Sequence, residues 1–274
     1  MILGIHYCGI SLHHVDKNWK LYCFVLGCYP YDLESHSAVN TRKFVESKLA
    51  DYKLELNDSV YVVSDNEAKM RATFKLNCKR IGCSVHYINK QLEHSFTTKE
   101  IDKTPVACDT IQQVFDSVKK IVAHVKRSHK QTEMSKRVQT YSETRFNGAY
   151  YMLHVFYEIF DELLVILHNT HLNECMMLDK DLLKQICSCL KVFDEAIEQL
   201  SDDKKPTIYK VLPLRQRLIN ECDVKPNDHD GLKEMKVFLS KLYFFIFVIS
   251  IITLVRINRG KIRQKFYNIY VINR

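Results

Sequence analysis

The sequence is poor in the two residues that make tight turns, with seven glycines and five prolines among 274 residues. An all-β sandwich needs many such turns, so their scarcity argues against that fold and favours long helices with short connections. Tryptophan occurs once, and we find neither an internal repeat nor a low-complexity tract. With 46% apolar residues, the chain is globular and long enough for a large core, or for one domain that carries another as an insertion.

Several signatures of function and targeting are also missing. We find no Walker loop, G-x-S-x-G elbow or HExxH helix, and no Asp or Glu follows Glu234. The N-terminus "MILGIHYCGISL" has no basic residue before its apolar stretch and no small-residue cleavage site, so it does not read as a secretory signal. The ten cysteines lack framework spacing, which is typical of buried thiols in a reducing compartment. We therefore expect a nuclear or cytoplasmic protein.

The formal charge of +8 is concentrated in a few places. The last 19 residues carry six basic residues and no acid, which leaves +2 for the other 255. Within that body, residues 117–140 hold seven Lys or Arg against one Glu, whereas residues 158–203 hold eleven acids against three Lys. The chain thus has a basic stretch followed by an acidic one, and a basic tail.

The first third of the chain alternates between strand and helix patterns. β-Branched and aromatic runs predict strands, and apolar residues at helical spacing predict helices. The pattern predicts an antiparallel hairpin at residues 2–12 and 20–29, followed by a helix at 39–54. Two short strands at 60–63 and 78–84 and a helix at about 86–95 follow.

From about residue 111 the pattern is helical. The segment "DLLKQICSCLKVFDEAIEQL" at 181–200 places its apolar residues on one helix face, which favours a helix-on-helix core. Pro206 and Pro213 interrupt this run, and "DVKPNDHDG" interrupts it again. A helical region therefore follows a mixed α/β region.

An apolar segment at 237–255 has three interpretations. Residues 242–255 carry no charge, and adding 237–241 gives 19 residues, close to the roughly 20 that span a membrane, with Lys241 near enough to the end to reach the headgroups. The segment is also rich in Phe, Ile and Val, so it could be a buried strand or helix of the core. The third interpretation is an unselected, aggregation-prone tail.

Two small features could carry chemistry. Asp65 lies two residues beyond the predicted strand 60–63, a place where a carboxylate binds a divalent metal or caps a turn or helix. Cys83 and His86 form a Cys-x-x-His. A zinc site would need two more ligands, and adding Cys78 and His94 gives none of the usual spacings. Core packing therefore competes with a site role for this pair.

Five segments occur in the order seen in one family: "HHVDKNWKL", "VSDNEAKM", "CSVH", "ETRFNGAYYML" and "KPTIYKVLPLRQRL". Over roughly residues 3–240 the chain resembles hAT-superfamily transposases of the hobo and Activator type, whose relatives include transposase-derived BED zinc-finger proteins, although we find no such finger here. The resemblance implies an α/β fold with a partial RNase H-like mixed sheet interrupted by a large all-α insertion. We expect the core at 1–110, the insertion at 111–230, and an apolar segment plus basic tail at 231–274.

In that family three carboxylates hold two Mg²⁺ or Mn²⁺ ions for DNA strand cleavage and transfer. Asp65 matches the second of them. The resemblance places the first acid on a strand before the hairpin and the last on a helix after the insertion, and this chain has neither. It therefore implies a truncated, inactive relative whose ancestral metal site is incomplete and which needs no cofactor.

The resemblance also implies residues that bind nucleic acid. Cys83 and His86 match a Cys-x-x-His that flanks the active site and organises the DNA end. Arg145 and Phe146 stand where the family has an Arg-Trp pair, and a phenylalanine ring retains a face for stacking on a base; a buried aromatic at a helix start is the alternative. The basic stretch would contact DNA phosphates, and the alternative is that it is simply a solvated helix face. The residues concerned are Lys119, Lys120, Lys126, Arg127 and Lys130.

We accordingly expect a domesticated, DNA-binding transposase relative that can associate with full-length relatives. The alternative is a membrane protein anchored through 237–255 and built on the same remnant. An active nuclease would need acids near Asp65 that the sequence does not supply.

Overall fold

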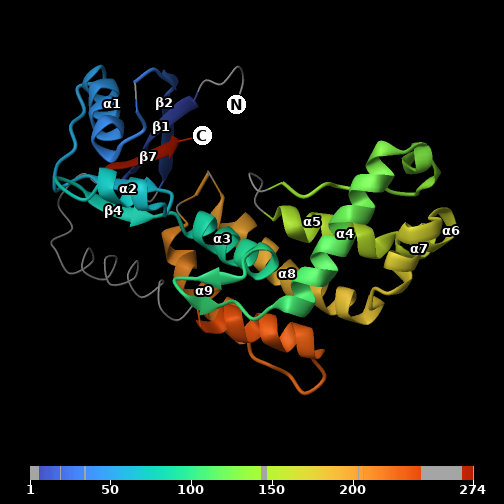
Figure 1. Ribbon diagram of the computed structural model, residues 1–274. Coiled ribbons are helices and arrows are strands. Elements are labelled where there is room, and N and C mark those ends of the chain that lie inside the picture. Colours follow the sequence, from blue (N-terminus) through green and yellow to red (C-terminus); the bar gives the residue numbers. More distant parts are fainter. Residues whose placement is uncertain are drawn as a thin grey trace. The chain divides into compact units, whose positions relative to one another are not determined.

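The chain forms two compact units in the computed structural model, shown in Figure 1. The structure describes residues 6–18, 20–33, 35–142, 147–202, 204–205, 207–241 and 267–273. The first unit combines Met1–Tyr87, Ser201–Tyr209 and Phe247–Arg274, and the second combines Ile88–Leu200 and Lys210–Ile246. Both ends of the chain thus belong to one unit.

The first unit contains a mixed five-stranded sheet in the order β2-β1-β7-β3-β4. Strands β1 (His6–Val15) and β2 (Leu21–Tyr31) form the antiparallel hairpin that the sequence predicts. The Asp16 carboxylate accepts hydrogen bonds from the backbone N–H groups of Asn18 and Lys20, both at 2.9 Å, and so closes the turn. Strands β3 (Tyr61–Ser64) and β4 (Lys79–Gly82) run parallel, also near their predicted positions.

Strand β7 (Tyr267–Asn273) lies between β1 and β3, and it is the red strand in Figure 1. It pairs antiparallel with β1 and parallel with β3. The sequence patterns predict only a basic tail here, so this strand is a finding of the structure. Successive residues of a strand point to opposite faces, so Ile269 and Val271 of the segment "YNIYVIN" share one face. Each is 1% exposed, and burial of this face explains why the segment enters the sheet.

Two helices contribute to the core on this sheet. Helix α1 (Ala38–Ala50) begins after Ser37, whose hydroxyl accepts a hydrogen bond from the backbone N–H of Asn40 at 3.2 Å. Helix α2 (Ala68–Thr73) is short and follows Asp65 closely. The core cluster joins apolar side chains of both helices to the strands, among them Phe44, Leu49, Met70, Ile10, Val62, Ile269 and Val271.

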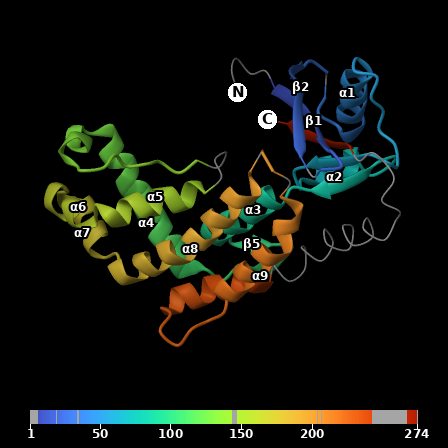
Figure 2. The ribbon, with the colours of Figure 1, turned by 180° about the vertical axis from the view of Figure 1, so that it is seen from behind.

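The second unit is predominantly helical, as the periodicity after residue 111 predicts. Helix α5 packs on α8, and α4 packs on α5 and α7 (Figure 2). A short hairpin of β5 (Glu100–Ile101) and β6 (Thr104–Pro105) precedes α4 and was not predicted. The helices are α3 (Ser84–Thr97), which begins in the first unit, α4 (Asp109–Arg127), α5 (Gly148–Glu158), α6 (Phe160–Ile166), α7 (Asn169–Met176), α8 (Lys180–Leu200), α9 (Val211–Glu221) and residues 230–241.

Helix α8 buries the face that its sequence pattern predicts, including Leu183, Ile186, Leu190 and Phe193. Pro213 lies in the first turn of α9, where proline is tolerated because the first N–H groups of a helix have no intrahelical partner.

The predicted membrane segment is covered only in part. Residues 237–241 belong to the helix that begins at 230, and 242–255 lie outside the described residues. Among the helices that the structure describes, none combines the length and the apolar character needed to cross a membrane.

The burial of β7 predicts that its side chains stabilise the first unit. Ile269→Ala should lower the free energy of unfolding by about 2–5 kcal/mol, because the methyl and methylene groups removed lie in the core. The matched control is Val25→Ala on β2, where the side chain is 80% exposed and the change should stay within about 0.5 kcal/mol. Urea denaturation measures both. Equal effects of the two substitutions would show that β7 is not part of the core.

Candidate functional site

The carboxyl ends of β3 and β4 bring Asp65 and Cys83 to the same edge of the sheet. The backbone N–H of Cys83 donates to the carbonyl of Ser64 at 2.8 Å, which continues the parallel pairing by one residue. The side-chain amide of Asn66 then donates to the carbonyl of Cys83 at 3.1 Å. Two segments that the sequence analysis singled out separately are therefore hydrogen-bonded neighbours.

The Asp65 carboxylate already has a local partner. Its Oδ1 accepts a hydrogen bond from the backbone N–H of Glu67 at 3.0 Å, which forms a turn just before α2 begins. This is the turn-capping role that competes with metal binding for an Asp after a strand. One oxygen of the carboxylate is thus committed to the backbone.

Arg80 contacts the loop that carries Asp65, and the sequence analysis did not identify it. Its Nε donates to the Ser64 hydroxyl at 2.9 Å, and its Nη2 donates to the Asp65 carbonyl and, at 3.3 Å, to Oδ1 of Asn66. Burial lowers the pKa of Arg80 and the charge of Asp65 opposes that shift, although an arginine stays protonated in proteins. A fixed cation thus lies against the loop that carries Asp65.

The signal that could have found Arg80 was its place in the sequence. It is a charged residue in the middle of a predicted strand, which is unusual unless a partner satisfies it. The hydrogen-bond partners of Arg80 could be identified only from the strand register. That register pairs Arg80 with Val62, and the partners follow Val62 by two to four residues.

Cys83 is a protonated thiol at the start of α3. Burial raises its pKa, the backbone N–H groups of His86 and Val85 oppose the shift, and the charge of Asp65 adds to it. A thiol in this state is a poor nucleophile and a poor metal ligand. His86 lies half-buried in the first turn of α3, three residues on.

The structure does not assemble the four-residue zinc set that the sequence allowed. Cys78 contacts Arg42, and the His94 ring hydrogen-bonds the Thr98 hydroxyl at 2.9 Å. Within the part of the chain that the structure describes, no three His, Cys, Asp or Glu side chains are grouped so that they could hold a metal ion.

The basic stretch is divided between one helix face and the loop after it. Lys119, Lys120, Lys126 and Arg127 are exposed on α4. Lys119 lies 5.5 Å from the centre of the Tyr141 ring, and Lys126 donates to the Thr140 hydroxyl at 3.3 Å. Both ammonium groups nevertheless remain at the surface, where a phosphate could reach them.

Two lysines of the basic stretch beyond α4, of which Lys130 was a predicted contact, are held more firmly. Lys130 donates to the carbonyl of Ile166 at 2.6 Å, and Lys136 pairs with Glu158 at 2.5 Å. These bonds tie the loop after α4 to α5 and α6. The four exposed residues of α4 are therefore the better candidates for phosphate contacts.

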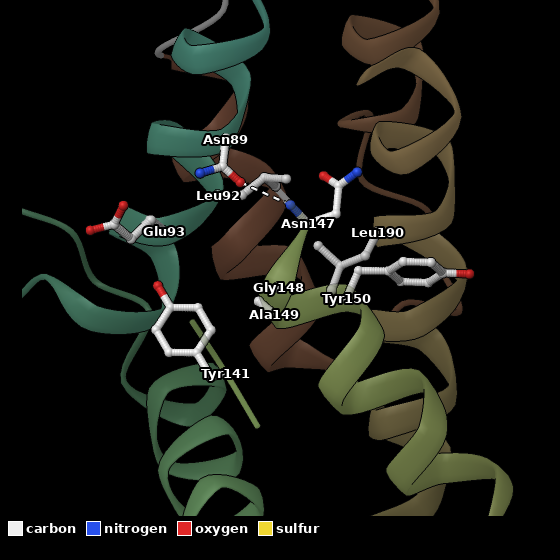
Figure 3. Close-up of a pocket in the computed structure, with 9 residues that line it drawn as sticks. All are labelled: Asn89, Leu92, Glu93, Tyr141, Asn147, Gly148, Ala149, Tyr150 and Leu190. Carbon is white, nitrogen blue, oxygen red and sulfur yellow. Dashed lines mark hydrogen bonds between the residues drawn. The ribbon is translucent and has the colours of Figure 1, made fainter. Parts of the chain in front are cut away.

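Arg145 and Phe146 lie outside the described residues, but the next residue is well defined. Asn147 has the left-handed backbone conformation, with φ of 59°, and directly precedes α5. Its backbone N–H donates to Oδ1 of Asn89 at 3.0 Å, the bond dashed in Figure 3, and its side-chain amide donates to Asp194 at 2.5 Å. These bonds fix the start of α5 against α3 and α8.

A small hollow lies at this point, lined by residues that include Tyr141, Asn147 and Tyr150 (Figure 3). Its volume is about 10 Å³, room for about one water molecule. Oδ1 of Asn147 is buried and has no hydrogen-bond partner among the described residues.

Comparison with known proteins gives one informative similarity. No family model matches the chain. The chain is 24% identical over 218 residues to the Transposable element Hobo transposase of Drosophila melanogaster, across 80% of this chain and 32% of that protein. It thus spans about a third of the length of the relative that it matches. The similarity supports a relationship to hAT-like transposases.

The contacts of Arg80 predict a local stabilising role. Arg80→Met should lower the free energy of unfolding by about 1–3 kcal/mol, because Ser64, Asp65 and Asn66 lose their donor while partly buried. Arg71→Met is the matched control, since Arg71 is exposed at the end of α2. Chemical denaturation of both variants tests this, and a control as unstable as Arg80→Met would refute the proposed contacts.

Proposed function

We propose that the chain is a catalytically inactive hAT transposase-like protein that retains nucleic-acid binding. The observation that carries this proposal is the surroundings of Asp65, the residue that matches a metal-binding carboxylate of the family. A guanidinium lies on one side, and an apolar strand lies on the other. The similarity to the hobo transposase supports the transposase-like origin.

The β7 side of Asp65 is defined by the strand register. Ser64 pairs with Val271 in parallel pairing, so the next residues along the two strands are Asp65 and Ile272. A carboxylate from the neighbouring strand would have to come from about this position to share a metal ion with Asp65. Isoleucine offers no ligand atom there.

The Arg80 side is unfavourable to a metal pair for an electrostatic reason. Two divalent ions in phosphoryl transfer need several carboxylates to offset their charge. A permanent positive charge beside the Asp65 loop repels them instead. We therefore infer that Asp65 is a remnant of a metal site and now serves as a turn residue.

The sheet order supports an RNase H-like origin of the first unit. A hairpin, a central strand and two parallel strands lie side by side, and the acid follows the first of the parallel pair. The mainly helical region that follows agrees with the expected insertion. In this proposal Cys83 and His86, at the edge next to Asp65, are remnants of the surface that organises a DNA end.

Nucleic-acid binding would rest on the exposed face of α4. Lys119, Lys120, Lys126 and Arg127 present four positive charges along one helix, enough for a salt-dependent, sequence-independent grip on phosphates. A nuclear location and association with full-length relatives belong to the same proposal.

The first test is enzymatic. We predict that the purified protein neither cleaves nor joins DNA strands in Mg²⁺ or Mn²⁺, because Asp65 belongs to no cluster of metal-binding side chains in the described part of the chain. A DNA-end cleavage assay on the native protein and on Asp65→Ala measures this. Metal-dependent cleavage by the native protein that disappears in Asp65→Ala would refute the inactive assignment.

The second test is binding. Changing Lys119, Lys120, Lys126 and Arg127 to Ala should weaken DNA binding on every sequence and reduce the slope of log K against log salt by about 0.9 for each phosphate contact removed. The matched control changes four exposed lysines elsewhere, namely Lys17, Lys53, Lys75 and Lys204. Fluorescence anisotropy over a salt series compares the two. If both variants bind alike, the α4 face is not the binding surface.

A further inference from the structure

The central strand of the sheet comes from the end of the chain. β1 and β3 belong to the first 64 residues, whereas β7 is formed by Tyr267–Asn273. No pairing joins β1 directly to β3 among the strand pairs of this sheet in the described part of the chain. The space between them is therefore a slot that one extended segment fills.

Both strands that border the slot pair with β7. Seven residue pairs join β7 to β1, from Cys8 with Asn273 to His14 with Tyr267, and four join it to β3. Ile269 and Val271 enter the core cluster, next to Ile10 and Val62. An empty slot would leave two rows of unpaired backbone groups and an open core, so it has a strong tendency to bind a strand.

The connection to β7 does not determine which sheet receives it. The last described residue before the strand is Lys241, and 25 residues, 242–266, separate the two. A chain of that length can reach about 80–90 Å when extended. A second molecule lies well within that distance in a dimer.

We propose that β7 is an exchangeable strand and that the slot between β1 and β3 takes Tyr267–Asn273 from a second copy of this chain. In such a dimer each copy gives its strand and receives the other. Every backbone pair and core contact of β7 is kept, so only the entropy of association opposes the exchange.

The balance between the two forms depends on concentration. A strand joined to its own unit by a connection of this length meets its own slot at an effective concentration of about the millimolar range. A dilute protein therefore keeps its own strand, and exchange occurs when copies unfold and refold together at high concentration. The proposal depends on the sheet geometry alone and is independent of any relationship to transposases.

A disulfide between copies tests it directly. Cys8 faces Asn273 across the antiparallel pair, and directly opposite residues have Cα atoms about 4.5–5.5 Å apart, which suits a disulfide. The first copy carries Asn273→Cys and Cys8→Ala, and the second keeps Cys8 and Asn273. Only an exchanged strand brings position 273 of the first copy to Cys8 of the second.

The two copies, carrying different affinity tags, are unfolded together, refolded at high concentration and mildly oxidised. We expect a covalent dimer whose peptide map contains a disulfide between position 273 and Cys8. A single chain with Asn273→Cys and native Cys8 should form the same bond within itself when dilute. Ile272→Cys is the matched control, because position 272 pairs with Gly9, which has no thiol, and successive residues of a strand alternate between the two faces of a sheet.

Each outcome decides the question. The internal bond without the bond between copies would overturn strand exchange and leave β7 as a fixed element. Failure of both bonds would show that the segment does not occupy the slot, which also overturns the proposal. A bond formed equally well by Ile272→Cys would mean that the crosslink does not report the register.

Discussion

Backbone pairing of β7 with both of its neighbours is the interaction on which the first unit depends. Without that pairing, the hairpin and the β3–β4 pair would be two separate two-stranded pieces, each too small to be stable alone. The core of α1 would also lose Ile269 and Val271. Because these contacts join residues more than 200 positions apart, forming them has a high cost in chain entropy. The position of Asp65 therefore depends on the last residues of the chain.

The sequence predicts those elements whose signal is local. The hairpin, α1, β3 and α8 follow from alternating or helical spacing of apolar residues, and the structure places each within a few residues of its expected position. Strand β7 could not be found this way. Its seven residues follow a long apolar run and a basic cluster, and no pattern within the segment predicts pairing with β1 and β3. Pairing between distant segments is a tertiary property, which local patterns do not carry.

The candidate site also contains residues that local patterns predict and residues that only the tertiary structure identifies. The place of Asp65, just beyond a buried strand, was predictable because β3 is short and strongly apolar. Arg80 was not, since its three contacts arise from the parallel register of β4 against β3. The turn bond from Asp65 to the N–H of Glu67 is local and was among the alternatives that the sequence left open. Local chemistry was thus foreseeable, and the neighbours that decide its use were not.

Catalysis and binding place different demands on such a protein. A metal pair needs carboxylates from separate elements to converge within a few ångströms, so the loss of one ligand is enough to remove the geometry. Phosphate binding needs only exposed positive charge, to which each residue adds separately. The face of α4 keeps four such residues on a helix anchored by its own apolar side. In the proposed function, metal-dependent chemistry is therefore lost by few changes while contact with nucleic acid is kept, because the two properties depend on different residues.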